Sequence, residues 1–250
     1  MTIRPGLCSV TFRQLDPAAI AALAASAGLK AIEWGGDVHV PPGDAVRAAE
    51  VARITADAGL AVASYGSYFR AEHGEDIAPV LDSAEALGAD RIRVWAGRIG
   101  SADATAAERA ATVDALAVAA EQAGSRGISL ALEFHGRTLA DDAEQTLRVL
   151  EEVGSPHLGT YWQPTVSASD AVAVAEYERI ADHVSAAHVF SWWPATQRLP
   201  LTARDGLWRA FFAAAAAAPV PPRDALLEFV PDDDPAALAA EAAALRAYLA

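Results

Sequence analysis

Residues 129–142 read SLALEFHGRTLADD, an apolar run that ends in Glu133 and His135 and then gives way to the start of a helix. The short apolar run predicts a buried strand, and the two aspartates at its far end predict the beginning of a helix. Residues two apart on a strand point to the same face, so Glu133 and His135 would lie together at the strand end. This arrangement indicates either a metal or proton-transfer site, or a solvated strand end at which His135 caps a loop.

The same strand-then-helix unit recurs along the whole chain. Gly28, Gly59 and Gly88 each follow a predicted helix, as glycine commonly does at helix ends. The predicted strands are residues 7–12, 29–34, 60–65, 90–97, 128–134, 157–162, 183–192 and 224–230. The predicted helices are residues 17–27, 44–58, 76–87, 105–122, 141–153, 169–181, 204–218 and 235–249.

Eight such units in 250 residues predict a single (β/α)8 TIM barrel that forms one domain over residues 1–250. The alternative fold is a doubly wound parallel sheet. It is disfavoured because VTFRQLDP, residues 10–17, stands after the first strand, where that fold commonly carries a glycine-rich phosphate-binding turn. No shift in composition suggests a second domain.

Composition and charge exclude several classes of partner. The formal net charge of −14 would repel nucleic acid and anionic membranes over most of the surface. The longest apolar tract, residues 210–220, is about half of the roughly 20 residues that a membrane helix needs. The lone cysteine, Cys8, cannot form an internal disulfide, and no secretory leader precedes residues 7–12. We therefore expect a cytoplasmic protein, and the sequence leaves open whether it forms a homo-oligomer.

In a TIM barrel the functional groups lie at the carboxyl ends of the strands. Polar and aromatic residues gather at these predicted ends: Phe12, Arg13, Glu33, Trp34, Tyr65, Ser67, Trp95, Arg98, Glu133, His135, Trp162, Gln163, His188 and Glu228. Glu133, His188 and Glu228 supply two carboxylates and one imidazole from strands five, seven and eight. Carboxylate oxygens suit hard divalent cations, and an imidazole shifts the preference toward manganese, cobalt or zinc.

With these residues the sequence resembles the xylose isomerase-like barrels, the superfamily of sugar isomerases and epimerases. The resemblance is strongest in LALEFHGRTLADD, LGTYWQP, AAHVFSWW and LLEFVPDDD, at residues 130–142, 158–164, 186–193 and 226–234. Members hold one divalent metal with a glutamate after strand five, an aspartate after strand six, a histidine on strand seven and a glutamate after strand eight. The resemblance therefore implies Glu133, Gln163, His188 and Glu228 as ligands of a manganese, magnesium, cobalt or zinc ion.

The sixth strand departs from this family pattern. Gln163 stands where the family has its aspartate, and Val166 stands where a histidine often follows. A glutamine side chain offers a neutral oxygen in place of a charged one, so we expect weaker metal binding. Gln163 could instead bond to substrate or backbone.

Several further side chains are candidates for binding substrate. His39, His135 and Arg98 follow strands two, five and four, although Arg98 could equally be a surface residue. Four tryptophans fall near strand ends, and aromatic walls commonly bind the faces of sugars. We expect two of these four to line the pocket, with Trp34 and Trp162 as the named candidates and core packing as the alternative role.

The resemblance implies an isomerase or epimerase that acts on a small sugar, ketose or polyol derivative. Glu133 and Glu228 would remove and return a carbon-bound proton by way of an enediolate. The same groups could expel a hydroxyl and act as a dehydratase. A sugar-binding barrel that has lost catalysis is a further alternative because of Gln163 and Val166. A phosphodiesterase on a similar barrel is disfavoured, because its metal site would need more histidine and aspartate ligands.

Overall fold

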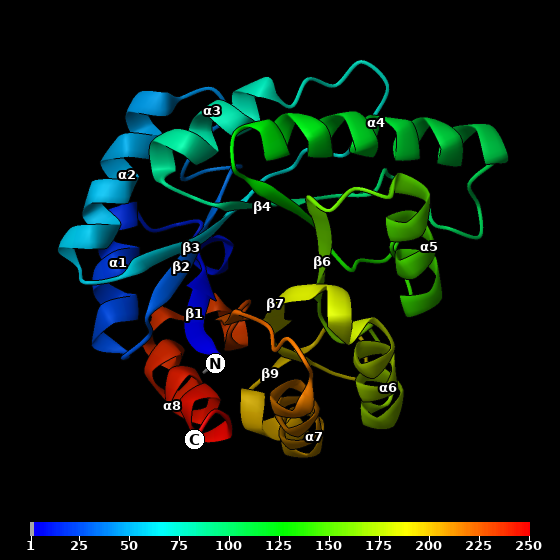
Figure 1. The fold of residues 1–250 in the computed structure, drawn as a ribbon. Helices are drawn as coiled ribbons and strands as arrows, with labels where there is room; N and C mark the ends of the chain where they lie inside the picture. Colours follow the sequence, from blue (N-terminus) through cyan, green and yellow to red (C-terminus); the bar gives the residue numbers. More distant parts are fainter. Residues whose placement is uncertain (1–2) are drawn as a thin grey trace.

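A computed structural model describes residues 3–250, in which eight parallel strands close into a barrel surrounded by helices (Figure 1). The barrel strands are β1 (Arg4–Cys8), β2 (Ala31–Gly35), β3 (Ala61–Gly66), β4 (Arg91–Val94), β5 (Ser129–Leu132), β6 (Leu158–Trp162), β7 (Val184–Val189) and β10 (Asp224–Leu227). Their order around the barrel follows the sequence, and β1 pairs with both β2 and β10. The predicted (β/α)8 barrel is therefore confirmed.

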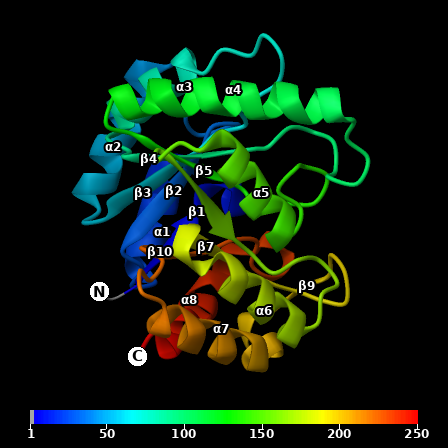
Figure 2. The same ribbon diagram turned by 45° about the vertical axis from the view of Figure 1, so that its right-hand side comes forward.

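One helix follows each strand on the outside of the barrel (Figures 1 and 2). The helices are α1 (Pro17–Ser26), α2 (Ala45–Asp57), α3 (Ala78–Leu87), α4 (Ala106–Ser125), α5 (Ala143–Val153), α6 (Asp170–Ile180), α7 (Asp205–Ala217) and α8 (Leu238–Tyr248). Asp16 caps α1 by accepting a hydrogen bond from the backbone N–H of Ala19, and Pro17 occupies the first turn. Among residues 3–250, no helix combines the length and apolar character that a bilayer crossing requires.

Strand one ends earlier than the sequence predicts. β1 stops at Cys8, and residues 9–12 form a short 3-10 helix. At this point the hydroxyl of Ser9 accepts a hydrogen bond from the backbone N–H of Gly35. A side-chain oxygen therefore replaces the backbone carbonyl that would have continued the pairing of β1 with β2. Strand seven also breaks, because Ser191–Trp192 (β8) pairs with Arg198–Leu199 (β9) in a separate antiparallel hairpin.

Alternation along the strands separates two layers of side chains. Most of the buried apolar residues pack between the strands and the outer helices. A smaller cluster fills the barrel interior and consists of Cys8, Val10, Ala31, Ala63, Ala131, Tyr161, Ala186 and Leu226. Since four of these residues are alanines, the interior has room for larger polar side chains from the neighbouring positions.

Candidate metal and proton-transfer site

A cavity of about 610 Å³ opens at the carboxyl ends of the strands. Side chains that come directly after β4, β5, β6 and β10 line it, namely Trp95, Glu133, Gln163 and Glu228. This volume lies within the usual range for a small-molecule site, and this end of a TIM barrel is where such sites form.

Two carboxylates that line the cavity, those of Glu133 and Glu228, approach a fully buried imidazole behind the lining, that of His188 on β7. Glu133, His188 and Glu228 each offer a ligand atom, and these atoms lie within 4.8 Å of one another. All three residues are buried. Gln163 joins them, because its Oε1 lies 3.1 Å from Nδ1 of His188, and Oε2 of Glu228 lies 3.5 Å from the same nitrogen. The structure thus brings together the four side chains that the sequence singled out as ligands.

A buried arginine, which the sequence interpretation missed, lies against this cluster. Arg93 on β4 is 3% exposed and lines the cavity. Its Nε donates to Oε1 of Glu33 at 3.3 Å, and its Nη1 contacts Oε2 of Glu133. Burial alone would lower the pKa of Arg93, but the Glu33 carboxylate and other nearby anionic groups raise it, so the guanidinium stays charged.

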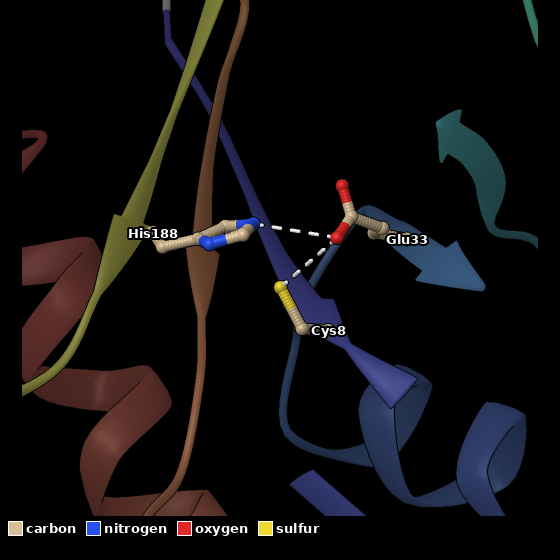
Figure 3. Close-up of side chains that lie close together, drawn as sticks. All are labelled: Cys8, Glu33 and His188. Atoms are coloured by element: carbon tan, nitrogen blue, oxygen red, sulfur yellow. Dashed lines mark hydrogen bonds and ion pairs between the residues drawn. The ribbon is translucent and has the colours of Figure 1, made fainter. Parts of the chain in front are cut away.

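Glu33 on β2 is a second buried group that was missed as a site residue. Figure 3 shows its carboxylate facing the His188 ring and the Cys8 thiol. Its Oε1 lies 3.3 Å from Nε2 of His188 and 3.8 Å from Sγ of Cys8. Ser64 donates to its other oxygen at 2.7 Å. Burial on its own would raise the pKa of Glu33, but the His188 ring and the Arg93 guanidinium hold that pKa well below its ordinary range.

The donor set formed by Glu133, Gln163, Glu228 and the His188 ring behind them fits a divalent cation. Two carboxylates, one imidazole nitrogen and one amide oxygen are ligand types that such ions accept. The three carboxylates of Glu33, Glu133 and Glu228 outnumber the one guanidinium of Arg93, which leaves an excess of two negative charges among these four groups. A divalent cation would balance that charge.

The ligand atoms of a second group, formed by Cys8, Glu33 and His188, also lie within 4.8 Å of one another. It fits a cation poorly. Burial and the nearby Glu33 raise the pKa of the Cys8 thiol, which keeps the sulfur protonated. Arg93 already supplies a positive charge to Glu33.

The two histidines expected to contact substrate lie in different places. His135 lines the cavity, with its ring 4.5 Å from that of Trp95 and its Nδ1 2.7 Å from the carbonyl of Gly136. His39 is 1% exposed and lies between the hydroxyl of Ser9 and the carbonyl of Leu15, away from the cavity lining. Of the two histidines, only His135 therefore lies where a molecule in the cavity could contact it.

Trp34, Trp162 and Arg98 also lie away from the cavity lining. Trp34 is buried outside the barrel wall and donates to Thr55 on α2. Trp162 is buried on the same layer and stacks on Phe211 of α7 with ring centroids 4.3 Å apart. Both tryptophans neighbour an inward-facing residue on their strand, so alternation turns them outward. Arg98 has a 61% exposed side chain and pairs with Glu72 in a surface loop.

Two other tryptophans supply the aromatic walls. Trp95 lies beside His135 and Tyr68, and Trp192 in the hairpin lies beside Phe190 and Phe229. All six side chains line the cavity: Tyr68, Trp95, His135, Phe190, Trp192 and Phe229. Two of the four tryptophans near strand ends therefore face the cavity, which is the expected number, but they are not the two that were named.

Comparison with protein families identifies one that matches most of the chain. A family model described as xylose isomerase-like TIM barrel matches residues 21–248. No curated protein sequence matches the chain.

Several solved structures share the fold at low sequence identity. The probable 3-DHS dehydratase of Bacillus anthracis superposes with a TM-score of 0.81 at 19% identity, covering 98% of this chain and 99% of that one. The 3-keto-D-glucoside 4-epimerase of E. coli gives a TM-score of 0.77 at 16% identity, covering 98% and 99% of the two chains. An L-ribulose 3-epimerase gives 0.71 at 19% identity, covering 98% and 95%.

Proposed function

The chain belongs to the xylose isomerase-like TIM barrel family, and from that premise we propose that it is a metal-assisted isomerase or epimerase of a small sugar, ketose or polyol derivative. The observation that carries this proposal is the pair of buried carboxylates, Glu133 and Glu228, which line the cavity and lie within 4.8 Å of a ligand nitrogen of His188. Isomerisation and epimerisation both take a proton from carbon and return it elsewhere or on the other face. Two carboxylates on different strands can divide these two tasks.

The remaining side chains bind and orient the substrate. Trp95 and Trp192 provide apolar surfaces for the faces of a sugar, and His135 provides a polar group beside them. The Arg93 guanidinium compensates the charge of Glu133 and fixes its position. Burial of both carboxylates excludes bulk water from the proton being moved.

Glu133, Gln163, His188 and Glu228 would hold the divalent ion. When bound there, such an ion supplies positive charge to the oxygen atoms of the substrate as they become more negative. Gln163 contributes an uncharged oxygen, so more of the charge of the ion is available to the substrate than in a site with an aspartate.

A dehydratase is the second candidate. The probable dehydratase of Bacillus anthracis gives the TM-score of 0.81 over nearly the whole of both chains. Dehydration also begins with loss of a proton from carbon, and the second carboxylate would then protonate the departing hydroxyl.

Incubation of the protein with manganese and a panel of ketoses and keto-polyols in deuterated water tests these functions. An isomerase or epimerase incorporates deuterium at carbon, and chelation of the metal abolishes the exchange. A dehydratase yields an unsaturated product with new ultraviolet absorbance. Ligand-induced thermal stabilisation with no exchange and no product would contradict both candidates and support a sugar-binding barrel.

A further inference from the structure

Glu33 lies behind the cavity lining and contacts side chains on three other strands. Its carboxylate is 2% exposed and does not line the cavity. Oε2 accepts the Ser64 hydroxyl at 2.7 Å, and Oε1 lies 3.3 Å from both Arg93 Nε and His188 Nε2. A buried carboxylate is costly unless it is paired, and here each partner comes from another strand.

The first of these contacts involves the imidazole that would bind metal. Nδ1 of His188 faces Gln163 and Glu228, whereas Nε2 faces Glu33 on the opposite side of the ring (Figure 3). Nε2 is buried and has no aligned hydrogen-bond partner among residues 3–250. Its 3.3 Å separation from Oε1 of Glu33 lies just beyond the usual hydrogen-bond range, and a proton on Nε2 would face that carboxylate. A proton on Nε2 leaves the lone pair of Nδ1 free for a cation.

The second contact reaches another candidate ligand. Arg93 lies between Glu33 and Glu133 and contacts a carboxylate oxygen of each. Because the guanidinium is planar and rigid, the position of Glu33 restrains the direction in which Arg93 presents its Nη1 to Glu133.

The strand next to β2 leaves space for this arrangement. A Cβ atom at Gly66, the last residue of β3, would lie 2.9 Å from Glu33 Oε1 and 3.1 Å from Arg93 Nη2. Any side chain at residue 66 would therefore displace the carboxylate or the guanidinium.

We propose that Glu33 is a positioning residue that orients two candidate metal ligands at once, His188 directly through Nε2 and Glu133 indirectly through Arg93. The proposal rests on the proposed function, in that it takes His188 and Glu133 as ligands. Glu33 itself contacts neither metal nor substrate. Partners of this kind behind a metal ligand typically contribute 10- to 100-fold in metal affinity.

The test compares Glu33→Gln with Glu241→Gln by manganese calorimetry. Glu241 is a matched control because it is also buried and accepts a hydrogen bond, from the backbone N–H of Leu201, and neither residue lines the cavity. We expect Glu33→Gln to weaken manganese binding about 10- to 100-fold and Glu241→Gln to leave it unchanged. Equal affinities in the two variants would overturn the proposal.

Nitrogen-15 NMR of the His188 ring separates positioning from simple loss of charge. The signals are assigned by their disappearance in His188→Gln. In the zinc-loaded wild type we expect the proton on Nε2, and in Glu33→Gln the Nε2 proton should exchange faster with water. Ring signals identical in wild type and Glu33→Gln would overturn the proposal even if affinity falls, because the carboxylate would then act through charge alone.

Glu33→Asp provides a second variant that preserves the charge, and it serves if Glu33→Gln does not fold. Its shorter side chain should still shift the His188 ring signals, and unchanged signals would contradict the proposal. If the wild type binds no cation, the proposed metal site fails. The metal-free ring signals of wild type and Glu33→Asp then decide the positioning role separately.

Discussion

Buried charges occupy both ends of the barrel interior, and the two ends balance them differently. At the amino-terminal end, Asp224 is fully buried and pairs through one oxygen with Arg4 and through the other with Arg91, both at 2.6 Å. Arg91 also donates to the carbonyls of Ser185 and Ala63. The fully buried charges there, those of Asp224 and Arg91, balance one to one, and the additional guanidiniums of Arg4 and Arg223 are partly exposed to solvent.

At the carboxyl end the balance is incomplete. Glu33, Glu133 and Glu228 face one guanidinium, that of Arg93. A buried ion pair in which the two charges balance has no net charge with which to bind an ion, whereas an excess of buried negative charge favours a cation. The amino-terminal cluster therefore contributes to folding, and the carboxyl-terminal cluster is suited to binding.

The largest expected effect is on turnover. Glu133→Gln and Glu228→Gln should each reduce proton exchange by about 10²- to 10⁴-fold, the range for loss of a general acid or base. Their thermal midpoints should stay within a few degrees of the wild type, because each substitution removes one of several carboxylates that repel one another. A large fall in midpoint with residual exchange would assign that glutamate to folding.

Stability should respond most at the opposite end. Asp224→Ala leaves Arg91 buried without its carboxylate and should cost about 3–5 kcal/mol of unfolding free energy. Urea unfolding measures this, with Asp16→Ala as the control, since loss of a helix cap costs about 1 kcal/mol. A loss no larger than that of the control would show that the amino-terminal cluster is not the stabilising one.

Metal binding should distinguish two histidines near the same cavity. His188→Ala should weaken manganese affinity by more than about 100-fold, or roughly 2.7 kcal/mol, because it removes a ligand and not merely a partner of one. His135→Ala should change the affinity little, since its ring lies against Trp95. Similar losses in calorimetric titrations of the two variants would remove His188 from the ligand set.

Gln163→Asp adds a negative charge to the carboxyl end of the barrel and so increases the difference in charge between its two ends. The new carboxylate should tighten manganese about tenfold, or 1.4 kcal/mol, although the shorter side chain offsets part of the gain. Calorimetry at one pH compares this variant with the wild type. Weaker or unchanged binding in a folded variant would mean that residue 163 does not face the metal.

The smallest effect concerns acid stability at the amino-terminal end. Arg223 donates hydrogen bonds to Asp90 and holds the pKa of that carboxyl below its ordinary value. The pair therefore stabilises the fold at neutral pH and loses this contribution as the pH falls below about 4. Asp90→Asn should flatten the acid dependence of unfolding slightly, and an unchanged profile would show that the pair contributes nothing.

The sequence was sufficient to predict the barrel and the four candidate ligands that the structure brings together. Apolar runs, helix caps and glycines predict local units, and parallel units bring their carboxyl ends together whatever lies between them. Glu133, Gln163, His188 and Glu228 could be found for that reason, with the resemblance supplying the ligand pattern.

Side-chain direction explains what was missed. Inward Glu33 requires outward Trp34, and inward Gln163 requires outward Trp162, so the strand period alone argued against both tryptophans. The same period in DRIRVW, residues 90–95, places two arginines on one face between apolar neighbours, a signal for Arg93. Their partners could not be predicted, because they belong to strands that are distant in sequence and meet only across the closed barrel.

The pairing of β1 with β10 joins Arg4 to Asp224 across 220 positions of the chain. During synthesis on a ribosome, β1 emerges first, and one of its edges stays open until almost everything else has been made. Of the candidate ligands, Glu133 follows β5 and is made midway along the chain, whereas His188 on β7 and Glu228 after β10 are made late. In a series of stalled nascent chains, metal affinity should therefore appear only when the last strands have been added. Because the pairing of β1 with β10 joins residues so far apart along the chain, we expect folding to be slow at this step.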